Sequence, residues 1–217
     1  LATWTPERRV LLGSMTEEQS RGLVSHLAGQ ELVGVAAYHP EVDAFKNAWL
    51  DQAPMRRADQ GMTLIHHDLP TLIEPRHCPG QARLAERSDL DVALAFQHAF
   101  REEVDLSAPP PRRAMLDIAL ARRELWLWQV GDEPVCYAGL RWPSANSSRI
   151  GPVYTPPEQR GKGYASALVF HLAKLGAARG RCTLFTDAAN PTSNKIYRAL
   201  GFTTPGVTFQ EWDFAAD

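Results

Sequence analysis

The spacing of apolar residues predicts that helices and strands alternate through the first third of the chain. Thr16 begins a capping-box pattern ahead of one helix, and the continuous apolar run at 32–38 is typical of a buried strand. A second helical pattern follows Pro40, and another strand is expected at 62–65. This order indicates a small α/β lobe.

Three prolines close together, Pro70, Pro75 and Pro79, interrupt this alternation. Proline and its neighbours disfavour both helix and sheet interiors, so such a segment is the best candidate for a domain boundary. We therefore predict an N-terminal α/β lobe with its connector at residues 1–79 and a second domain at residues 80–217.

The second domain shows a different order: one strand, two helices, three strands, and then helix, strand, helix and strand. Its clearest signal is a hairpin, in which two apolar runs flank a Gly-Asp turn. The expected elements are a strand at 81–85, a helix that begins at Ser88 and is broken by the prolines of 107–111, a helix around Met115, the hairpin strands at 125–130 and 135–142, a strand at 149–154, a helix from 164, a strand at 182–186, a helix from 191 and a last strand at 206–214.

Charge and cysteine content narrow the classes of partner and compartment. The 217 residues include 23 basic and 25 acidic ones, a formal net charge of -2, so no overall field attracts nucleic acid or an anionic membrane. The three cysteines are widely spaced and odd in number, which favours reduced thiols. No apolar run approaches the length of a membrane span. We expect a cytoplasmic protein with no nucleic-acid or membrane partner.

A loop of glycines and basic residues separates the strand expected at 149–154 from the helix after it. Gly161 and Gly163 permit positive φ and let the backbone approach a ligand closely. Arg160 and Lys162 place charge beside the free N–H groups of the first helical turn, so a phosphate fits there. The Walker pattern fails because a glycine follows the loop lysine, and the dinucleotide fingerprint fails because serine replaces its third glycine.

Two motifs together resemble those of one superfamily. Residues 159–165, Gln-Arg-Gly-Lys-Gly-Tyr-Ala, resemble the pyrophosphate loop (Q/R-x-x-G-x-G/A) of the GNAT superfamily of acyl-CoA N-acyltransferases. Residues 190–202 resemble that superfamily's N-x-x-S-x-x-x-Y-x-x-x-G-F element, and a helix and a strand separate the two motifs in the required order. The resemblance covers residues 80–217, and the first lobe is similar to the degenerate lobe of some bacterial members.

The resemblance implies an α/β (α+β) fold in which helices flank a mixed, mostly antiparallel sheet. It also implies an N-acetyltransferase that moves an acetyl group from acetyl-CoA to a primary amine by direct attack in a ternary complex. Acetyl-CoA would be a cosubstrate, and no metal is expected. The acceptor is not identified by the sequence, although a small molecule is expected, and the protein would be a monomer or a homodimer.

The resemblance also assigns roles to individual residues. Asn190 and Ser193 would contact the pantetheine arm, and Tyr197 would protonate the departing thiolate, since a phenol with a pKa of about 10 holds its proton at neutral pH. Independently, Gly151 and Pro152 predict that their strand parts from a neighbour and leaves backbone groups of Val153, Tyr154 and Thr155 unpaired for the arm. An ordinary edge strand is the alternative. The expected cofactor-binding residues are Val153, Tyr154, Thr155, Gln159, Arg160, Gly161, Lys162, Gly163, Tyr164, Ala165, Ser166, Asn190 and Ser193.

The sequence leaves alternatives for the function of the chain and for several individual residues. A non-catalytic acyl-CoA sensor would keep the same loop, although Asn190 and Tyr197 favour the enzyme. For Tyr197 itself, the alternative to a general acid is a packed aromatic residue. A metal site among the histidines near residue 66 matches no standard ligand spacing. Three tryptophans on the hairpin strands fit either an acceptor pocket or the core. The candidate general bases are Glu102, Glu103, Glu124 and Glu158, each of which is more typical of solvated surface.

Overall fold

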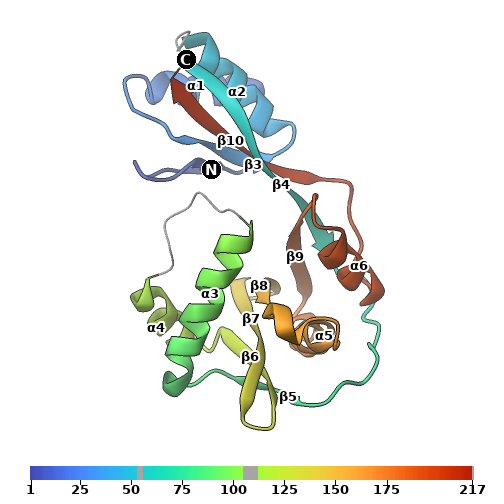
Figure 1. Ribbon diagram of the computed structural model, residues 1–217. Helices are drawn as coiled ribbons and strands as arrows, with labels where there is room; N and C mark the ends of the chain where they lie inside the picture. Colours follow the sequence, from blue (N-terminus) through green and yellow to red (C-terminus); the bar gives the residue numbers. More distant parts are fainter. Residues whose placement is uncertain (53–55, 105–111, 217) are drawn as a thin grey trace. The chain divides into compact units, whose positions relative to one another are not determined.

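The computed structural model describes residues 1–52, 56–104 and 112–216, and the chain forms two compact units. The chain passes between them more than once, so neither unit is a single stretch of sequence. Figure 1 shows this through its colours, because the red end of the chain lies with the blue beginning. The first unit comprises Leu1–His66, Thr186–Pro191 and Thr204–Asp217, and the second comprises His67–Phe185 and Thr192–Thr203.

The first unit places two helices against a five-stranded part of the sheet, in the order β1-β2-β3-β10-β4. Its first helix begins as predicted, because the Thr16 hydroxyl accepts from the Gln19 N–H and the Gln19 side chain accepts from the Thr16 N–H. The elements are β1 (Ala2–Thr3), β2 (Val10–Leu12), α1 (Glu17–His26), β3 (Gly34–Tyr38), α2 (Glu41–Gln52), β4 (Arg56–Asp68) and β10 (Thr208–Ala216).

The last strand corrects the prediction that it completes the sheet of the second domain. β10 instead lies between β3 and β4, with Phe209 opposite both Tyr38 and Leu64 in antiparallel register. Trp212 and Phe214 pack into the core of the first unit. The apolar pattern identified a strand correctly, but alternation along one strand carries no information about its partners.

The second unit contains the other five strands, in the order β9-β8-β7-β6-β5. β8 and β9 are parallel and the remaining pairs are antiparallel, which confirms the mixed, mostly antiparallel fold. The proline-rich break predicted at 107–111 lies outside the described residues. The elements are β5 (Gln81–Leu84), the 3-10 turn η1 (Arg87–Asp89), α3 (Leu90–Val104), α4 (Arg113–Ala121), β6 (Leu125–Val130), β7 (Glu133–Ser144), β8 (Ser147–Tyr154), the 3-10 turn η2 (Pro157–Gln159), α5 (Tyr164–Ala177), β9 (Arg181–Asp187) and α6 (Pro191–Ala199).

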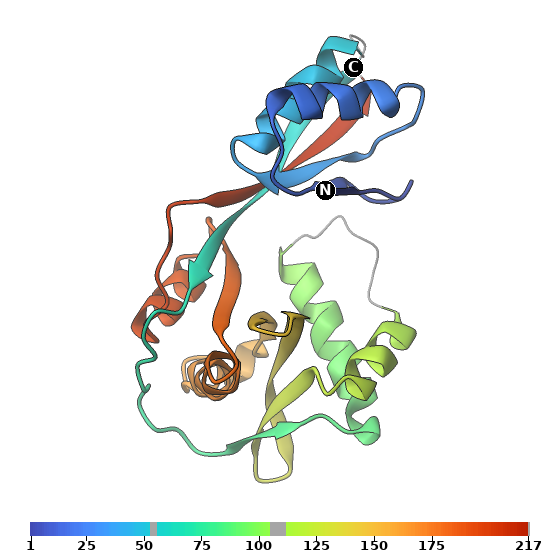
Figure 2. The ribbon, with the colours of Figure 1, turned by 180° about the vertical axis from the view of Figure 1, so that it is seen from behind.

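Helices cover both faces of the second unit's strands, as Figure 2 shows with α3 and α4 on one side and α5 on the other. Alternation along β6 explains this arrangement: Leu125 and Leu127 pack towards α3 and α4, whereas Trp126 packs towards α5. The three hairpin tryptophans, Trp126, Trp128 and Trp142, all pack against the core beside α5. Their position favours the core over an acceptor pocket.

The division into an N-terminal lobe with its connector at residues 1–79 and a second domain at residues 80–217 stays a prediction. Along the chain, the first change of unit lies between His66 and His67. This point falls within β4, which runs beyond the predicted strand to Asp68. Within the described residues, no helix is both long enough and apolar enough to cross a membrane.

Candidate functional site

β8, the strand that leads into the glycine loop, stops pairing with one neighbouring strand and stays paired with the other. The parallel register between β8 and β9 ends with Ile150 opposite Leu184, and no later pair follows among the described residues. On its other edge, β8 remains paired with β7, with Val153 opposite Ala138. The predicted parting is therefore confirmed on the β9 side only. A strand edge of this kind can pair with the amides of an extended ligand.

Two glycines produce the irregularity at which the strand parts. The register between β7 and β8 shifts between Ala138 and Leu140, opposite Gly151, whose φ is +139°. A Cβ atom on Gly139 would lie 2.7 Å from the Gly151 carbonyl oxygen. Pro152 has no N–H to donate to a ladder, so pairing is weakened at the same point. The bulge thus requires glycine at position 139.

Replacing Gly139 by alanine is expected to destabilise the protein by about 1 to 3 kcal/mol, the usual cost of overpacking a tight contact. Thermal unfolding of the wild type and of Gly139→Ala measures this difference in stability. Gly22→Ala is the control, because Gly22 lies inside α1 with no heavy atom within 4 Å of an added Cβ. The control should not destabilise the protein. Equal melting temperatures for Gly139→Ala and the wild type would contradict the close approach of the two strands.

The loop before α5 has the backbone geometry that the sequence predicts. Gly161 and Gly163 have φ of +77° and +87°, and Gly163 is the N-cap of the helix. The Gly163 carbonyl accepts the Ala167 N–H at 3.0 Å, so the first turn is regular. The N–H groups at the start of a helix have no partner within it, and the helix dipole favours an anion there. The loop is therefore a candidate phosphate site.

The cationic side chains of the loop hold protein partners. Arg160 Nη2 lies 2.6 Å from both carboxylate oxygens of Glu103, and its Nε donates to the Thr155 carbonyl at 2.9 Å. The prediction that the backbone of Thr155 is unpaired is therefore wrong for its carbonyl group. Lys162 Nζ donates to Gln159 Oε1 at 2.8 Å, and Gln159 Nε2 donates to Glu133 Oε1 at 3.2 Å.

The helix that carries the second motif begins and ends where the sequence predicts. α6 starts at Pro191, directly after Asn190, and Gly201 closes it with φ of +95°. The Gly201 and Phe202 N–H groups donate back to the carbonyls of Arg198 and Tyr197, both at 3.0 Å, which is the Schellman pattern of a helix end.

Tyr197 faces the core rather than solvent. Its side chain is only 8 % exposed, and its ring meets those of His67 and Phe202 edge-on, with centroids 6.4 and 6.1 Å away. Burial raises the pKa of the Tyr197 hydroxyl, and the nearby Cys136 raises it further. The phenol therefore stays protonated over the whole physiological pH range, as a proton donor must.

A buried thiol beside this region was not singled out by the sequence. Cys136 is fully buried on β7, and the Thr155 hydroxyl donates to its sulfur at 3.2 Å. Burial raises the pKa of Cys136 to about 12. Because the thiolate is the nucleophilic form of cysteine, this residue is not a nucleophile at neutral pH.

The four candidate bases differ in their surroundings. Glu103 is bound by Arg160 and also accepts from the Tyr154 hydroxyl at 3.3 Å. Glu102 and Glu158 are exposed and Glu124 is half-buried. The geometry singles out none of the four as a general base. Among the described residues, no cluster of three or more histidine, cysteine or acidic side chains is placed to hold a metal ion.

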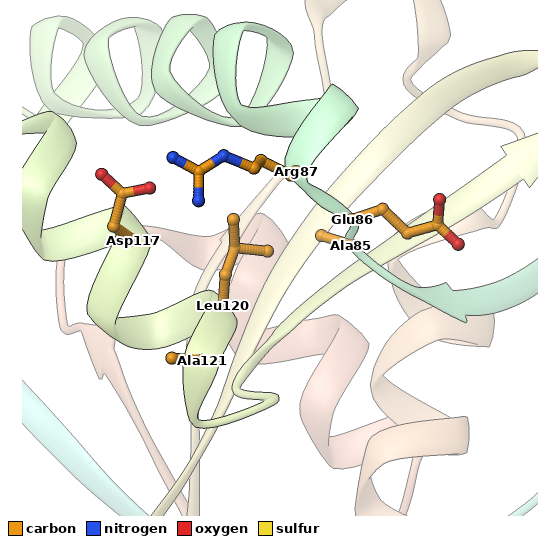
Figure 3. A pocket seen from close by; sticks show the side chains of 6 residues that line it. All are labelled: Ala85, Glu86, Arg87, Asp117, Leu120 and Ala121. Atoms are coloured by element: carbon orange, nitrogen blue, oxygen red, sulfur yellow. The ribbon is translucent and has the colours of Figure 1, made fainter.

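A separate hollow of about 580 Å³ lies where the end of β5 and η1 face α4. In Figure 3 the side chains of Arg87 and Asp117 point towards each other beside Leu120. None of its lining residues belongs to the glycine loop or to α6, so the hollow does not mark the phosphate site. The lining residues are Ala85, Glu86, Arg87, Asp117, Leu120 and Ala121.

Comparisons with known proteins agree with this architecture. Residues 92–202 match the model of the acetyltransferase (GNAT) family. An acetyltransferase of the GNAT family from Colwellia psychrerythraea is similar in structure, with a TM-score of 0.66 and 16% identity over 92% of this chain and 72% of that chain. A GCN5-related N-acetyltransferase from Sphaerobacter thermophilus has a TM-score of 0.61 and 18% identity over 85% of this chain and 60% of that chain.

A further similar structure is that of a Drosophila protein whose description names no activity. Its TM-score is 0.70 at 11% identity, over 98% of this chain and 72% of that chain. At such identities the likeness shows the fold alone. No curated protein matches the chain.

Proposed function

Because this chain belongs to the GNAT family of acetyltransferases, we propose that it transfers an acetyl group from acetyl-CoA to a primary amine of a small acceptor. The observation that carries the proposal is the glycine loop at the start of α5, which directly follows the strand that parts from β9. The loop suits a pyrophosphate, and the parted strand suits an amide-bearing arm.

The residues present fit the proposed donor. The backbone N–H groups from Gly161 to Ala165 would hold the pyrophosphate together with the helix dipole, because the two glycines have no side chains to keep a ligand away from the backbone. The β9-facing edge of Val153 and Tyr154 would hold the pantetheine arm. When bound, acetyl-CoA supplies the acetyl group as a thioester. Asn190 and Ser193, at the start of α6, remain proposed contacts of the arm.

Tyr197 is the proposed general acid. Its buried hydroxyl keeps its proton, since the environment that raises its pKa disfavours the phenolate. The same low polarity also raises the proton affinity of a sulfur that departs beside it. Tyr197 therefore donates its proton more readily once negative charge has developed on the departing sulfur. The amine would attack the acetyl carbon directly, the new C–N bond would replace the C–S bond, and the proton that the nitrogen loses would pass to solvent.

Direct transfer predicts that the protein itself is never acetylated as an intermediate. Cys136 has a pKa of about 12 and is therefore a thiol at neutral pH, so it cannot take up the acetyl group. Intact-protein mass spectrometry after incubation with acetyl-CoA alone should find an unmodified chain. An acetyl group on Cys136 that a later amine removes would contradict direct transfer.

The proposal is tested by the release of CoA from acetyl-CoA in the presence of a broad panel of amines. We expect release that depends on one class of amine and that yields the acetylated amine in equal amount. Binding of acetyl-CoA without release for any amine would instead indicate a non-catalytic acyl-CoA sensor. No binding at all would contradict both functions.

A further inference from the structure

The ion pair between Arg160 and Glu103 joins the glycine loop to the last turn of α3. Glu103 lies one residue before the end of this helix, 57 positions away from Arg160 in the sequence. The same carboxylate accepts from the Tyr154 hydroxyl at 3.3 Å. Phe96 and Phe100 of α3 pack against the Tyr154 ring, with centroids 5.8 and 6.5 Å away. These contacts fix Glu103 beside the loop.

This ion pair acts against phosphate binding by Arg160, which is the role that the sequence predicts for it. A guanidinium that points its donors at a carboxylate has fewer donors for a phosphate, and its charge is neutralised. The carboxylate also brings a negative charge close to the position of the pyrophosphate. Both effects act against an anionic ligand.

We propose that Glu103 competes with the pyrophosphate of the acyl-CoA donor for Arg160 and thereby weakens donor binding. This inference rests on the proposed function. Glu103 is then a positioning residue, which acts through Arg160 without contacting the reacting atoms. Donor binding transfers Arg160 from Glu103 to the pyrophosphate and releases the carboxylate at the end of α3.

The exposure of both side chains allows Arg160 to exchange Glu103 for the pyrophosphate. The side chains of Arg160 and Glu103 are 47% and 41% exposed, so water can replace either partner. Ion pairs with this exposure contribute little to stability. A pyrophosphate carries more charge than a carboxylate and offers several oxygens to the guanidinium, so Arg160 gains by the change of partner.

The test is a calorimetric titration of Glu103→Gln with CoA itself. Glutamine keeps the shape of the side chain and removes its charge, so the dissociation constant should fall by roughly three- to tenfold relative to the wild type. The gain should shrink as the salt concentration rises. An unchanged dissociation constant would mean that Glu103 does not hinder donor binding, and a higher one would mean that Glu103 orients Arg160 for the phosphate; either result would overturn the proposal. Glu103→Ala gives the same answer if the glutamine variant is poorly folded.

Glu133→Gln is the matched control, because Glu133 also contacts the loop, but through Gln159. It should change the dissociation constant much less than Glu103→Gln. In an Arg160→Gln background, only the smaller effect of removing the carboxylate's repulsion of the pyrophosphate should remain; an effect of full size there would overturn competition for Arg160. Failure of the wild type to bind CoA would contradict the proposed function itself, whereas wild-type binding that is insensitive to Glu103 would contradict only this inference.

Discussion

Replacing Tyr197 by phenylalanine is expected to lower the single-turnover rate of acetyl transfer by about 10²- to 10⁴-fold, the usual contribution of a general acid. The change removes one hydroxyl and leaves the ring against His67 and Phe202. Affinity for acetyl-CoA should therefore change little. Single-turnover measurement is required, because slow product release can hide a loss in the chemical step.

Tyr137→Phe is the control for removing a buried phenol. Tyr137 is also buried, and its hydroxyl accepts from Gln97 Nε2 at 2.6 Å on the α3 side of the strands. This variant should lose about 1 to 3 kcal/mol of stability, because Gln97 loses its partner, but it should retain the rate of transfer. A Tyr197→Phe protein with the wild-type single-turnover rate would leave Tyr197 as a packing residue and solvent as the proton source.

Replacing Gly163 by aspartate is expected to abolish acetyl-CoA binding at ordinary concentrations. A carboxylate at the start of α5 lies against the anion, and like charges about 5 Å apart cost on the order of 3 kcal/mol near a protein surface, or more than 10² in affinity. An added Cβ has space, since its nearest neighbour is the Cys78 Cβ atom at 3.7 Å, and aspartate tolerates the left-handed backbone at φ +87° better than most residues. The protein should therefore still fold.

Thermal unfolding with and without acetyl-CoA measures this loss of binding. For the wild type, acetyl-CoA at a hundred times its dissociation constant should add about 2.7 kcal/mol, or roughly 5 to 10 °C. The Gly163→Asp protein should show no such shift. Gly163→Asn is the matched control, because asparagine also tolerates the left-handed backbone and adds no charge, so most of the shift should remain. An equal shift for Gly163→Asp and the wild type would place the donor elsewhere.

The sequence predicted local structure well wherever one residue type is required by geometry. The positive φ of Gly161 and Gly163, the start of α6 at Pro191 and its end at Gly201 are all local consequences of backbone chemistry. The parting of the strand at Gly151 followed from the same kind of argument. Such features need no knowledge of the rest of the chain.

Features that join distant parts of the chain could not be predicted in this way. The position of β10 between β3 and β4 depends on partners far away in the sequence, such as Tyr38 and Leu64 opposite Phe209, which an apolar pattern does not specify. Glu103 looked like a solvated surface residue, because nothing near it in the sequence indicates Arg160 as its partner. The pKa of Cys136 likewise depends on burial by several elements at once.

Hydrogen exchange with and without saturating acetyl-CoA is the most direct test of where the donor binds. N–H groups at the start of a helix exchange readily without a ligand, because they have no partner within the helix. We predict that acetyl-CoA slows exchange in peptides covering residues 153–166 and leaves the hollow at 85–87 unchanged. Unchanged exchange at 153–166 under saturating acetyl-CoA would contradict the glycine loop as the donor site.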